Sequence, residues 1–378
     1  MIEEQLQEYA GRTSPPSGLT AERVLSTART RARRSRLAGG ATAVLLVAAL
    51  AGGVAVAWSR TGTPAEFATA ACAVDRLPLP QQLADTVKIT GMDPTGRYVL
   101  ATGGSPAAPV GVMWTDGKPA VLAFTPRSVN SAGLVVGFTG PDTHADDAAR
   151  RPVRLLGGRL AELPLPTGAS GGLAWAVDTA GDVLGSAYFE RTGYRAVLWR
   201  SGAAAPVVLD GDGLYGEVLT DDGTALGFAA DGGRSVRWSP GHAPVPLPLP
   251  VGVATATVWS AAGDWATGHG DDENLKGDNG SGPAVRWNLR TGTAELIPGL
   301  LGLPVVSTTG VVAGSVGSAY PASGKLPGFW HDGALYALRL PPGVRPAGGG
   351  AVAAISADGR TMAGYTQQPA TALLWRNC

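Results

Sequence analysis

From residue 86 to the carboxyl terminus, short apolar runs alternate with turns rich in glycine and small polar residues. The pattern is clearest between Gly172 and Leu209, where the apolar runs predict four successive strands at residues 173–178, 182–188, 195–200 and 206–209. Four antiparallel strands joined by tight turns form one blade of a β-propeller. This unit is therefore predicted to be a blade.

One turn signal recurs seven times along the same part of the chain. It consists of a small polar residue, two variable residues, a glycine, a short apolar run and a further glycine. The copies begin Asp93-Pro-Thr-Gly96, Asn130-Ser-Ala-Gly133, Asp178-Thr-Ala-Gly181, Thr220-Asp-Asp-Gly223, Ser260-Ala-Ala-Gly263, Ser307-Thr-Thr-Gly310 and Ser356-Ala-Asp-Gly359. Their first glycines lie 37, 48, 42, 40, 47 and 49 residues apart, and a period in the forties is typical of propeller blades. The repeats predict an all-β fold: a seven-bladed β-propeller with four-stranded blades over residues 76–378.

A tryptophan recurs near the end of the predicted third strand. It is found in six units, with Leu155 in its place in the second unit, and the six residues are Trp114, Trp199, Trp238, Trp287, Trp330 and Trp375. A row of rings could also serve as a ligand platform. Because the ring recurs in nearly every unit, we interpret these residues as packing between neighbouring blades, where one bulky side chain fills the wedge between twisted sheets.

The two ends of the repeat region are predicted to meet. The seventh unit stops at Cys378 without a fourth strand, whereas Leu77-Pro-Leu-Pro80 matches the trace predicted for fourth strands, as in Leu163–Pro166 and Leu247–Pro250. A strand from the amino-terminal side would therefore complete the last blade and remove its open edge. The only two cysteines, Cys72 and Cys378, would then lie close enough for a disulfide. The alternative is two unrelated thiols.

The repeat resembles a known family of bacterial extracellular repeats, named HAF after their His and Phe. The resemblance rests on Asx/Ser-x-x-Gly-x-Val-x-Gly followed by Ala-Val-x-Trp, and it covers about residues 86–378. The His and Phe are absent here, and the matching triplet in the third unit is Arg195-Ala196-Val197. Such proteins generally have no assigned activity, so the resemblance implies a fold and no reaction.

The amino-terminal region predicts a membrane anchor. Leu37 to Trp58 is a run of 22 residues without charge, about 33 Å long as a helix and sufficient to cross a ~30 Å hydrocarbon core. The positive-inside rule then places residues 1–36 in the cytoplasm, with 59–75 as a linker and the propeller outside the cell membrane. Five arginines precede the run, at Arg29, Arg31, Arg33, Arg34 and Arg36.

Two other readings of this region stay open. A cleaved signal peptide could end at Ala68-Thr69-Ala70, although its basic region and apolar core would both be unusually long. A lipoprotein attached through Cys72 is the weaker alternative, because this cysteine lies far beyond the apolar run. The leader 1–36 resembles the cytoplasmic leaders of actinobacterial single-pass proteins, including membrane-bound anti-sigma factors. It would act as a topology determinant or bind a cytoplasmic partner.

Composition narrows the class of protein but indicates no chemistry. The chain has 55 glycines and 29 prolines, and only 16% of its residues are charged, as expected for an all-β fold with many turns. Residues 1–58 carry seven arginines and four glutamates, whereas residues 59–378 carry 23 basic and 26 acidic residues. The large domain has no long basic run, so nucleic acid is not a predicted partner.

Candidate chemical motifs are weak. Gly211–Gly216 fits a dinucleotide fingerprint by letter but precedes a predicted strand where a helix is required. Calcium could in principle be held by Asp210–Gly213, or by Asp271–Glu273 with Asp278, but both sets have too few ligands. The carboxylates Asp264 and Glu190 and the four histidines, His144, His242, His269 and His331, show no catalytic or metal-ligand spacing. No catalytic, cofactor-binding or metal-binding residue is predicted.

The favoured function is a membrane-tethered scaffold that binds an extracytoplasmic protein or glycan. Recognition would use the loops between second and third strands, which vary most, at Gly137–Arg151, Gly268–Gly282 and Gly314–Pro327. The alternatives are an extracytoplasmic sensor that signals through the leader to a cytoplasmic regulator, and a propeller hydrolase or lyase. Several carboxylates or a metal at one mouth of the central channel would favour the enzyme.

Overall fold

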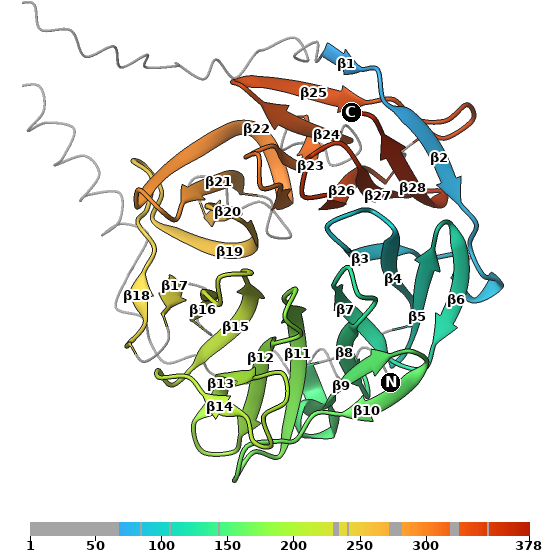
Figure 1. The fold of residues 1–378 in the computed structure, drawn as a ribbon. Coiled ribbons are helices and arrows are strands. Elements are labelled where there is room, and N and C mark those ends of the chain that lie inside the picture. The colour runs from blue at the N-terminus through green and yellow to red at the C-terminus, as the bar shows by residue number, and fades with distance from the viewer. Residues whose placement is uncertain are drawn as a thin grey trace, which may run out of the picture. The chain divides into compact units, whose positions relative to one another are not determined.

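The computed structural model describes residues 68–83, 85–105, 107–142, 144–229, 234–239, 242–271, 282–317, 325–345 and 348–378, all within one compact unit, Gly62–Cys378 (Figure 1). The predicted leader 1–36, the predicted membrane helix 37–58 and the first part of the linker lie outside the described residues. In the ranges that are described, no helix has the length and apolar character needed to cross a bilayer.

Nearly all of the regular structure is antiparallel β-sheet, which confirms the predicted all-β fold. Sheet 1 contains β3 (Lys88–Met92), β4 (Tyr98–Ser105), β5 (Ala108–Thr115) and β6 (Lys118–Leu122). Sheet 2 contains β7 (Thr125–Val129), β8 (Val135–Thr139), β9 (Arg151–Leu156) and β10 (Arg159–Glu162). Sheet 3 contains β11 (Gly171–Val177), β12 (Val183–Phe189), β13 (Gly193–Trp199) and β14 (Val207–Val208). Sheet 4 contains β15 (Leu214–Leu219), β16 (Ala225–Ala229), β17 (Ser235–Trp238) and β18 (Val245–Pro246).

The next strands form one larger sheet of eight strands. It contains β19 (Thr255–Ala262), β20 (Trp265–Asp271), β21 (Pro283–Asn288), β22 (Thr293–Val306), β23 (Val312–Val316), β24 (Leu326–His331), β25 (Ala334–Leu338) and β1 (Ala68–Ala70). The long strand β22 joins its two halves, because the beginning of β22 pairs with β21 and its end pairs with β23.

The closing sheet combines both ends of the described chain. It contains β26 (Gly350–Ile355), β27 (Met362–Gln367), β28 (Ala370–Arg376) and β2 (Ala73–Leu77). Figure 1 shows all the sheets set around a common centre, with β3, β7, β11, β15, β19, β22 and β26 nearest to it. Two short 3-10 helices, η1 (Gln81–Leu83) and η2 (His144–Ala149), lie between strands.

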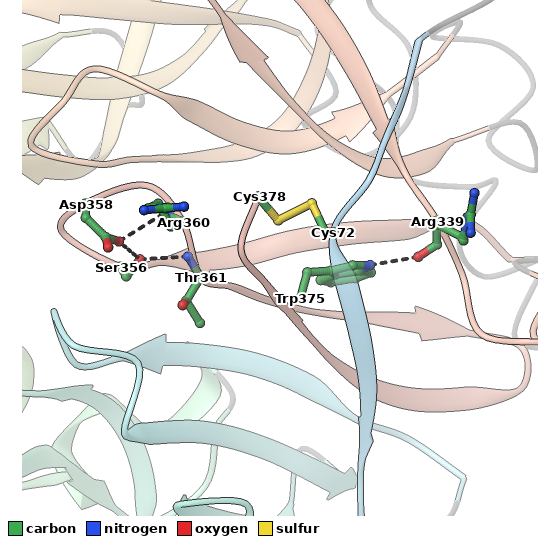
Figure 2. Close-up of a disulfide and its surroundings, with 8 residues drawn as sticks. All are labelled: Cys72, Arg339, Ser356, Asp358, Arg360, Thr361, Trp375 and Cys378. Carbon is green, nitrogen blue, oxygen red and sulfur yellow. Dashed lines mark hydrogen bonds between the residues drawn. A yellow bond between two sulfur atoms is a disulfide. The ribbon is translucent and has the colours of Figure 1, made fainter.

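The predicted closure is present. Strand β2 pairs antiparallel with β28, Ala73 opposite Arg376 and Leu77 opposite Ala372. Beside this pair, Cys72 and Cys378 form the predicted disulfide, with their Cα atoms 4.6 Å apart and 306 positions separating them in the sequence (Figure 2). The last sheet therefore has no open edge on that side, and a covalent bond holds it closed.

The prediction that the Leu-Pro-Leu-Pro segments form the fourth strands is wrong, because the observed fourth strands come earlier in the sequence. Strands β2, β10 and β18 end at Leu77, Glu162 and Pro246, and the Leu-Pro-Leu-Pro segments follow or only overlap their last residues. The reason is that proline has no backbone N–H to donate to a ladder. These segments instead connect one sheet to the next, where their carbonyl groups accept hydrogen bonds from the recurrent tryptophans.

Five of the six tryptophans occupy the same environment. Each is buried, and its ring N–H donates to a backbone carbonyl in the connection from the preceding sheet, at 2.7 to 2.8 Å. The pairs are Trp114–Pro78, Trp199–Pro164, Trp238–Asp210, Trp287–Pro248 and Trp375–Arg339, the last of which is drawn in Figure 2. Trp330 differs: it is half-buried, and the guanidinium of Arg286 lies over its ring.

Six of the seven turn signals form the same turn. The backbone N–H of the glycine donates to the carbonyl of the first residue, and the glycine has a φ near +80°, a region that favours glycine. The fifth copy does not form this turn. Ser260 pairs with Thr267 inside the ladder, and Gly263 and Asp264 make a two-residue hairpin. The Ser260 hydroxyl accepts a hydrogen bond from the backbone N–H of Val306, at the end of β22, and does not cap its own turn.

Candidate ligand-binding channel

Six innermost strands each contain one β-bulge. At each bulge a single residue has no partner in the ladder, and these residues are Thr90, Arg127, Trp175, Glu217, Trp259 and Ala353. In β22 the interruption is longer, between Leu301 and Val305. A bulge leaves the extra residue outside the ladder and re-aims its side chain. All six bulge residues line one central cavity.

The bulges explain the second glycine of the repeated signal. In five sheets this glycine lies on the second strand, opposite the residue that comes just before the bulge. The five glycines are Gly137, Gly185, Gly227, Gly268 and Gly364. A Cβ atom there would lie 1.7 to 2.2 Å from a carbonyl oxygen of the innermost strand, far inside contact distance. Sheet 1 is the exception, with Ala101 at that position. In these five sheets the glycine leaves room for the close approach of the bulged backbone.

The cavity has a volume of about 1190 Å³ and is lined by residues of every innermost strand. Turn residues such as Pro94 and Ala357 line one end, which we call the turn mouth. Lys88, Lys325 and Gln367, near the loops between second and third strands, line the other, which we call the loop mouth. The volume is somewhat larger than the ~300–1,000 Å³ of a usual small-molecule site.

Hydrogen bonds between neighbouring turns fix the turn mouth. They run from Asn130 Nδ2 to the Asp178 carbonyl (2.9 Å), from Thr179 N–H to Asp221 Oδ1 (3.0 Å), from Thr308 Oγ1 to the Ala357 carbonyl (2.7 Å) and from Ala357 N–H to the Pro94 carbonyl (2.9 Å). These bonds join turns of adjacent sheets, so this end of the channel is held as a nearly continuous rim.

One wall of the channel carries an ordered arginine. The guanidinium of Arg127 lies over the rings of Trp175 and Phe138, at 4.6 and 5.3 Å from their centroids. Its Nη2 donates to both carboxylate oxygens of Asp142, at 3.2 Å each. Stacking and the carboxylate together hold the cation in one orientation at the channel surface.

The charged groups of this wall perturb one another. Burial, assisted by the nearby charge of Arg127, lowers the pKa of Lys88, and Asp142 partly opposes this. Burial raises the pKa of Glu217 to about 8, although the charge of Arg127 acts in the opposite direction. At neutral pH Glu217 is therefore largely protonated. Among the described side chains at the loop mouth, Lys88, Arg127 and Lys325 then outnumber the ionised Asp142.

Three adjacent bulge residues have hydrogen-bonding capacity that the protein does not use. Thr90 Oγ1, Arg127 Nε and Trp175 Nε1 are buried, and none of them has a hydrogen-bond partner among the described residues. A buried polar atom without a partner costs about 1–3 kcal/mol. Such a cluster on a cavity wall indicates a place where water or a ligand completes the bonds.

The opposite wall has small residues on its innermost strands. Gly302, Gly349, Ala351 and Ala353 line it, and Ala353 occupies the bulge position that Trp175 fills on the other side. Because this bulge position carries only a methyl group, it leaves the space in front of it open. Leu303, Tyr365, Gln367 and Lys325 also line the cavity on this side.

The residues singled out in the sequence for chemistry are scattered. Asp264 pairs with Arg290 at 3.0 Å on the surface, and Glu190 is exposed. His269 lines the channel, whereas His242 and His331 are exposed. The structure shows no group of three or more metal-ligating side chains within the ranges it describes.

The remaining candidate motifs give no site. The side chains of His144 and Asp271 are not described, and the other calcium candidates, Asp272, Glu273 and Asp278, fall outside the described residues. Gly211–Gly216 leads into strand β15, so no helix follows it. In the other calcium candidate, Asp212 forms an ion pair with Arg195 at 3.2 Å.

Sequence reasoning missed the channel residues. A usable signal exists, because Thr90, Arg127, Trp175, Glu217 and Ala353 each lie three positions before the polar residue of a turn signal. The residue types at that position range from Thr90 and Ala353 to Arg127, Trp175 and Glu217, whereas the residues on either side are small or apolar. Trp259 breaks the spacing because the fifth turn is displaced.

Comparison with known proteins gives the fold. No protein-family model matches the sequence, and no curated protein matches it. A solved streptogramin B lyase superimposes with a TM-score of 0.52 at 14% identity, over 81% of this chain and 97% of that one. The virginiamycin B lyase from Staphylococcus aureus gives 0.53 at 15%, over 81% and 99%. The fold is a β-propeller. At such low identity the similarity carries no information about activity.

Proposed function

We propose that this protein is a binding protein: a seven-bladed β-propeller held on the outer face of the cell membrane by a helix at Leu37–Trp58. Seven turn signals support the count of blades, with the eight-stranded sheet taken as two blades that share β22. The uncharged run and the arginines before it support the anchor. A disulfide across the closure suits a compartment where thiols oxidise.

One observation carries the proposal of binding. The positions that pack sheet against sheet recur, whereas the channel-facing positions vary between sheets and include Arg127, Trp175 and Glu217. Burying charged and polar groups in a cavity lowers stability unless they are matched. A wall that keeps them is therefore expected to serve recognition.

The proposed macromolecular partner, an extracytoplasmic protein or glycan, would meet the loop mouth. The loops between second and third strands gather there, and Gly137–Arg151 contains η2. Asp142 in this loop also orients Arg127, so contact at the rim is linked to the channel wall.

The anchor and the partner are tested on the full-length chain in bacterial membranes. Alkaline carbonate should leave the protein in the membrane, and protease added to spheroplasts should remove the propeller and leave the leader protected. Release by carbonate, or loss of the leader to protease, would refute the tether. Cross-linking in intact cells should capture one partner, and replacing residues 141–149 by a short glycine-serine loop should abolish that capture.

A second candidate is catalysis in the channel, favoured by Glu217. Its carboxyl has a pKa of about 8 and lies near Arg127, an arrangement suited to general acid–base chemistry. A streptogramin B lyase has a similar fold. Incubation with a streptogramin B, followed by liquid chromatography and fragmentation mass spectrometry, should show a ring-opened product that is lost in Glu217→Gln. Elimination leaves the mass unchanged and hydrolysis adds one water, so the retention time and the fragments identify the product. Substrate that is unchanged in both would exclude this substrate and favour binding alone.

A further inference from the structure

We propose that the channel holds a small organic anion, with its acidic group between Lys88 and Arg127 and a flat apolar part between Trp175 and the small-residue wall. This goes beyond the proposed scaffold, because occupancy of the channel requires no macromolecular partner. The acidic group is a carboxylate or a phosphate, since both accept several hydrogen bonds from cationic donors.

The charge of the wall selects an anion. Lys88, the first residue of β3, is accessible within the cavity, and its ammonium lies close enough to Arg127 for the two positive charges to affect each other. Lys325 lines the same mouth. In the part of this mouth that the structure describes, the acids beside these cations are Asp142, already bound to Arg127, and Glu217, whose pKa burial raises to about 8. An anion bound here therefore relieves the repulsion between Lys88 and Arg127.

The polar atoms without hydrogen-bond partners also favour an anionic ligand. Trp175 Nε1 and Arg127 Nε can only donate hydrogen bonds, and the Thr90 hydroxyl can donate as well. All three belong to bulge residues of consecutive sheets, so they lie on one arc of the wall. Donors without acceptors favour a ligand rich in acceptor oxygens.

The shape of the cavity sets the rest of the ligand. Two indole rings, Trp175 and Trp259, line it, and Ala353 and Gly302 leave room on the opposite side. A planar apolar group would cover the exposed ring surface and fill this space. The cavity is large enough for a molecule of drug size, and the exposed Lys88 lies at the loop mouth, so an anion would enter from that side.

Fluorine NMR on the full-length protein in lipid nanodiscs tests the proposal with four probes of similar size. These are fluorinated phenylacetate, phenyl phosphate, phenylacetamide and phenethylammonium, with empty nanodiscs as the control for partitioning. One or both anions should bind at least about 10-fold more tightly than the neutral amide, as expected for charge-assisted hydrogen bonds. The tighter anion identifies the acidic group. Equal binding of amide and anions, or tighter binding of the cation, would overturn the proposal.

Matched variants locate the site. Lys88→Gln should weaken the anion at least about 10-fold, whereas Lys118→Gln on the exposed outer strand β6 should not. Ala353→Trp should abolish binding by filling the cavity from the far wall, whereas Ala120→Trp on β6 should leave it unchanged. Anion binding that survives Ala353→Trp would show that it lies elsewhere. Should a channel variant fail to fold, the comparison of probes on the unmodified protein still decides.

Discussion

Two positions recur in most sheets of this protein, and they behave in opposite ways. On the third strand a buried tryptophan recurs and donates to the connection from the preceding sheet in five cases. On the innermost strand the bulge residue changes from Thr90 to Arg127, Trp175, Glu217, Trp259 and Ala353. The first position meets a copy of the same surface each time, whereas the second meets open space. The recurring residues therefore hold neighbouring sheets together, and the varying residues determine the chemistry of the central channel.

The closure should show the largest effect on stability. The double variant Cys72→Ser/Cys378→Ser frees a loop of 306 residues and should lower the free energy of unfolding by about 5 kcal/mol in the chain-entropy model. Asp75→Asn removes only the exposed ion pair with Arg376 on the same two strands and should cost less than about 1 kcal/mol. Guanidinium unfolding curves measure both. Equal losses would mean that the disulfide adds nothing to strand pairing.

The contrast between packing and channel positions is tested by two tryptophans. Trp375→Ala removes a ring with 0% exposure and should cost about 3–5 kcal/mol. Trp259→Ala removes a half-buried ring from the channel wall and should cost well under half as much. If unfolding curves show a larger loss for Trp259, the channel is part of the core and the distinction fails.

The bulges themselves are tested by two glycines on second strands. At Gly185 an added Cβ would lie 2.0 Å from the Leu173 carbonyl oxygen, so Gly185→Ala should cost about 3 kcal/mol or more. At Gly314, opposite the longer interruption of β22, the nearest carbonyl oxygen is 3.0 Å away, and Gly314→Ala should cost about 1 kcal/mol. Thermal unfolding of the two variants gives the comparison. Similar losses would argue against the bulge as the reason for the glycine.

The smallest expected effect comes from Glu217, measured between about pH 6 and pH 7. Its pKa of about 8 exceeds the ordinary 4.5, so the folded state keeps a proton that the unfolded state releases. The free energy of unfolding should therefore fall as pH rises from about 4.5 to about 8, by about 1 kcal/mol between about pH 6 and pH 7. Glu217→Gln should lack this slope, so the difference in free energy of unfolding between the two proteins should vary with pH. A difference that does not vary with pH would mean that the pKa of Glu217 is not raised in the folded state.

The sequence predicted the parts of the fold that depend on repetition. The strands around each turn, the strand completed from the amino-terminal side and the Cys72–Cys378 bond follow from local turn chemistry and from where the last unit stops. The Leu-Pro segments were predicted to be the fourth strands, but they follow these strands, or overlap only their last residue, and connect one sheet to the next. The repeat shows that each blade ends near these segments, but it does not distinguish a strand from the connection after it. The turn at Ser260 failed because a two-residue hairpin competes with it.

The residues that line the channel could not be predicted from the sequence repeats, because their properties depend on neighbours from other strands and loops. Arg127 matters because Asp142, Phe138 and Trp175 surround it, and these residues come from a loop and two other strands. Glu217 is perturbed by burial, which depends on how the sheets close around it. In a single sequence, a variable position cannot be distinguished from one without a role. The variable bulge positions are recognised as channel residues only when the sheets are placed around a common centre.

The most direct measurement combines stability and binding in one variant, Lys88→Gln/Trp175→Phe. Both substitutions change only channel positions, so the free energy of unfolding should stay within about 1 kcal/mol of the unmodified protein. Binding of the fluorinated anion should be lost in the same sample. A folded variant that binds the anion as before, or a variant that no longer folds, would contradict the division between a repeated frame and a variable, ligand-binding centre.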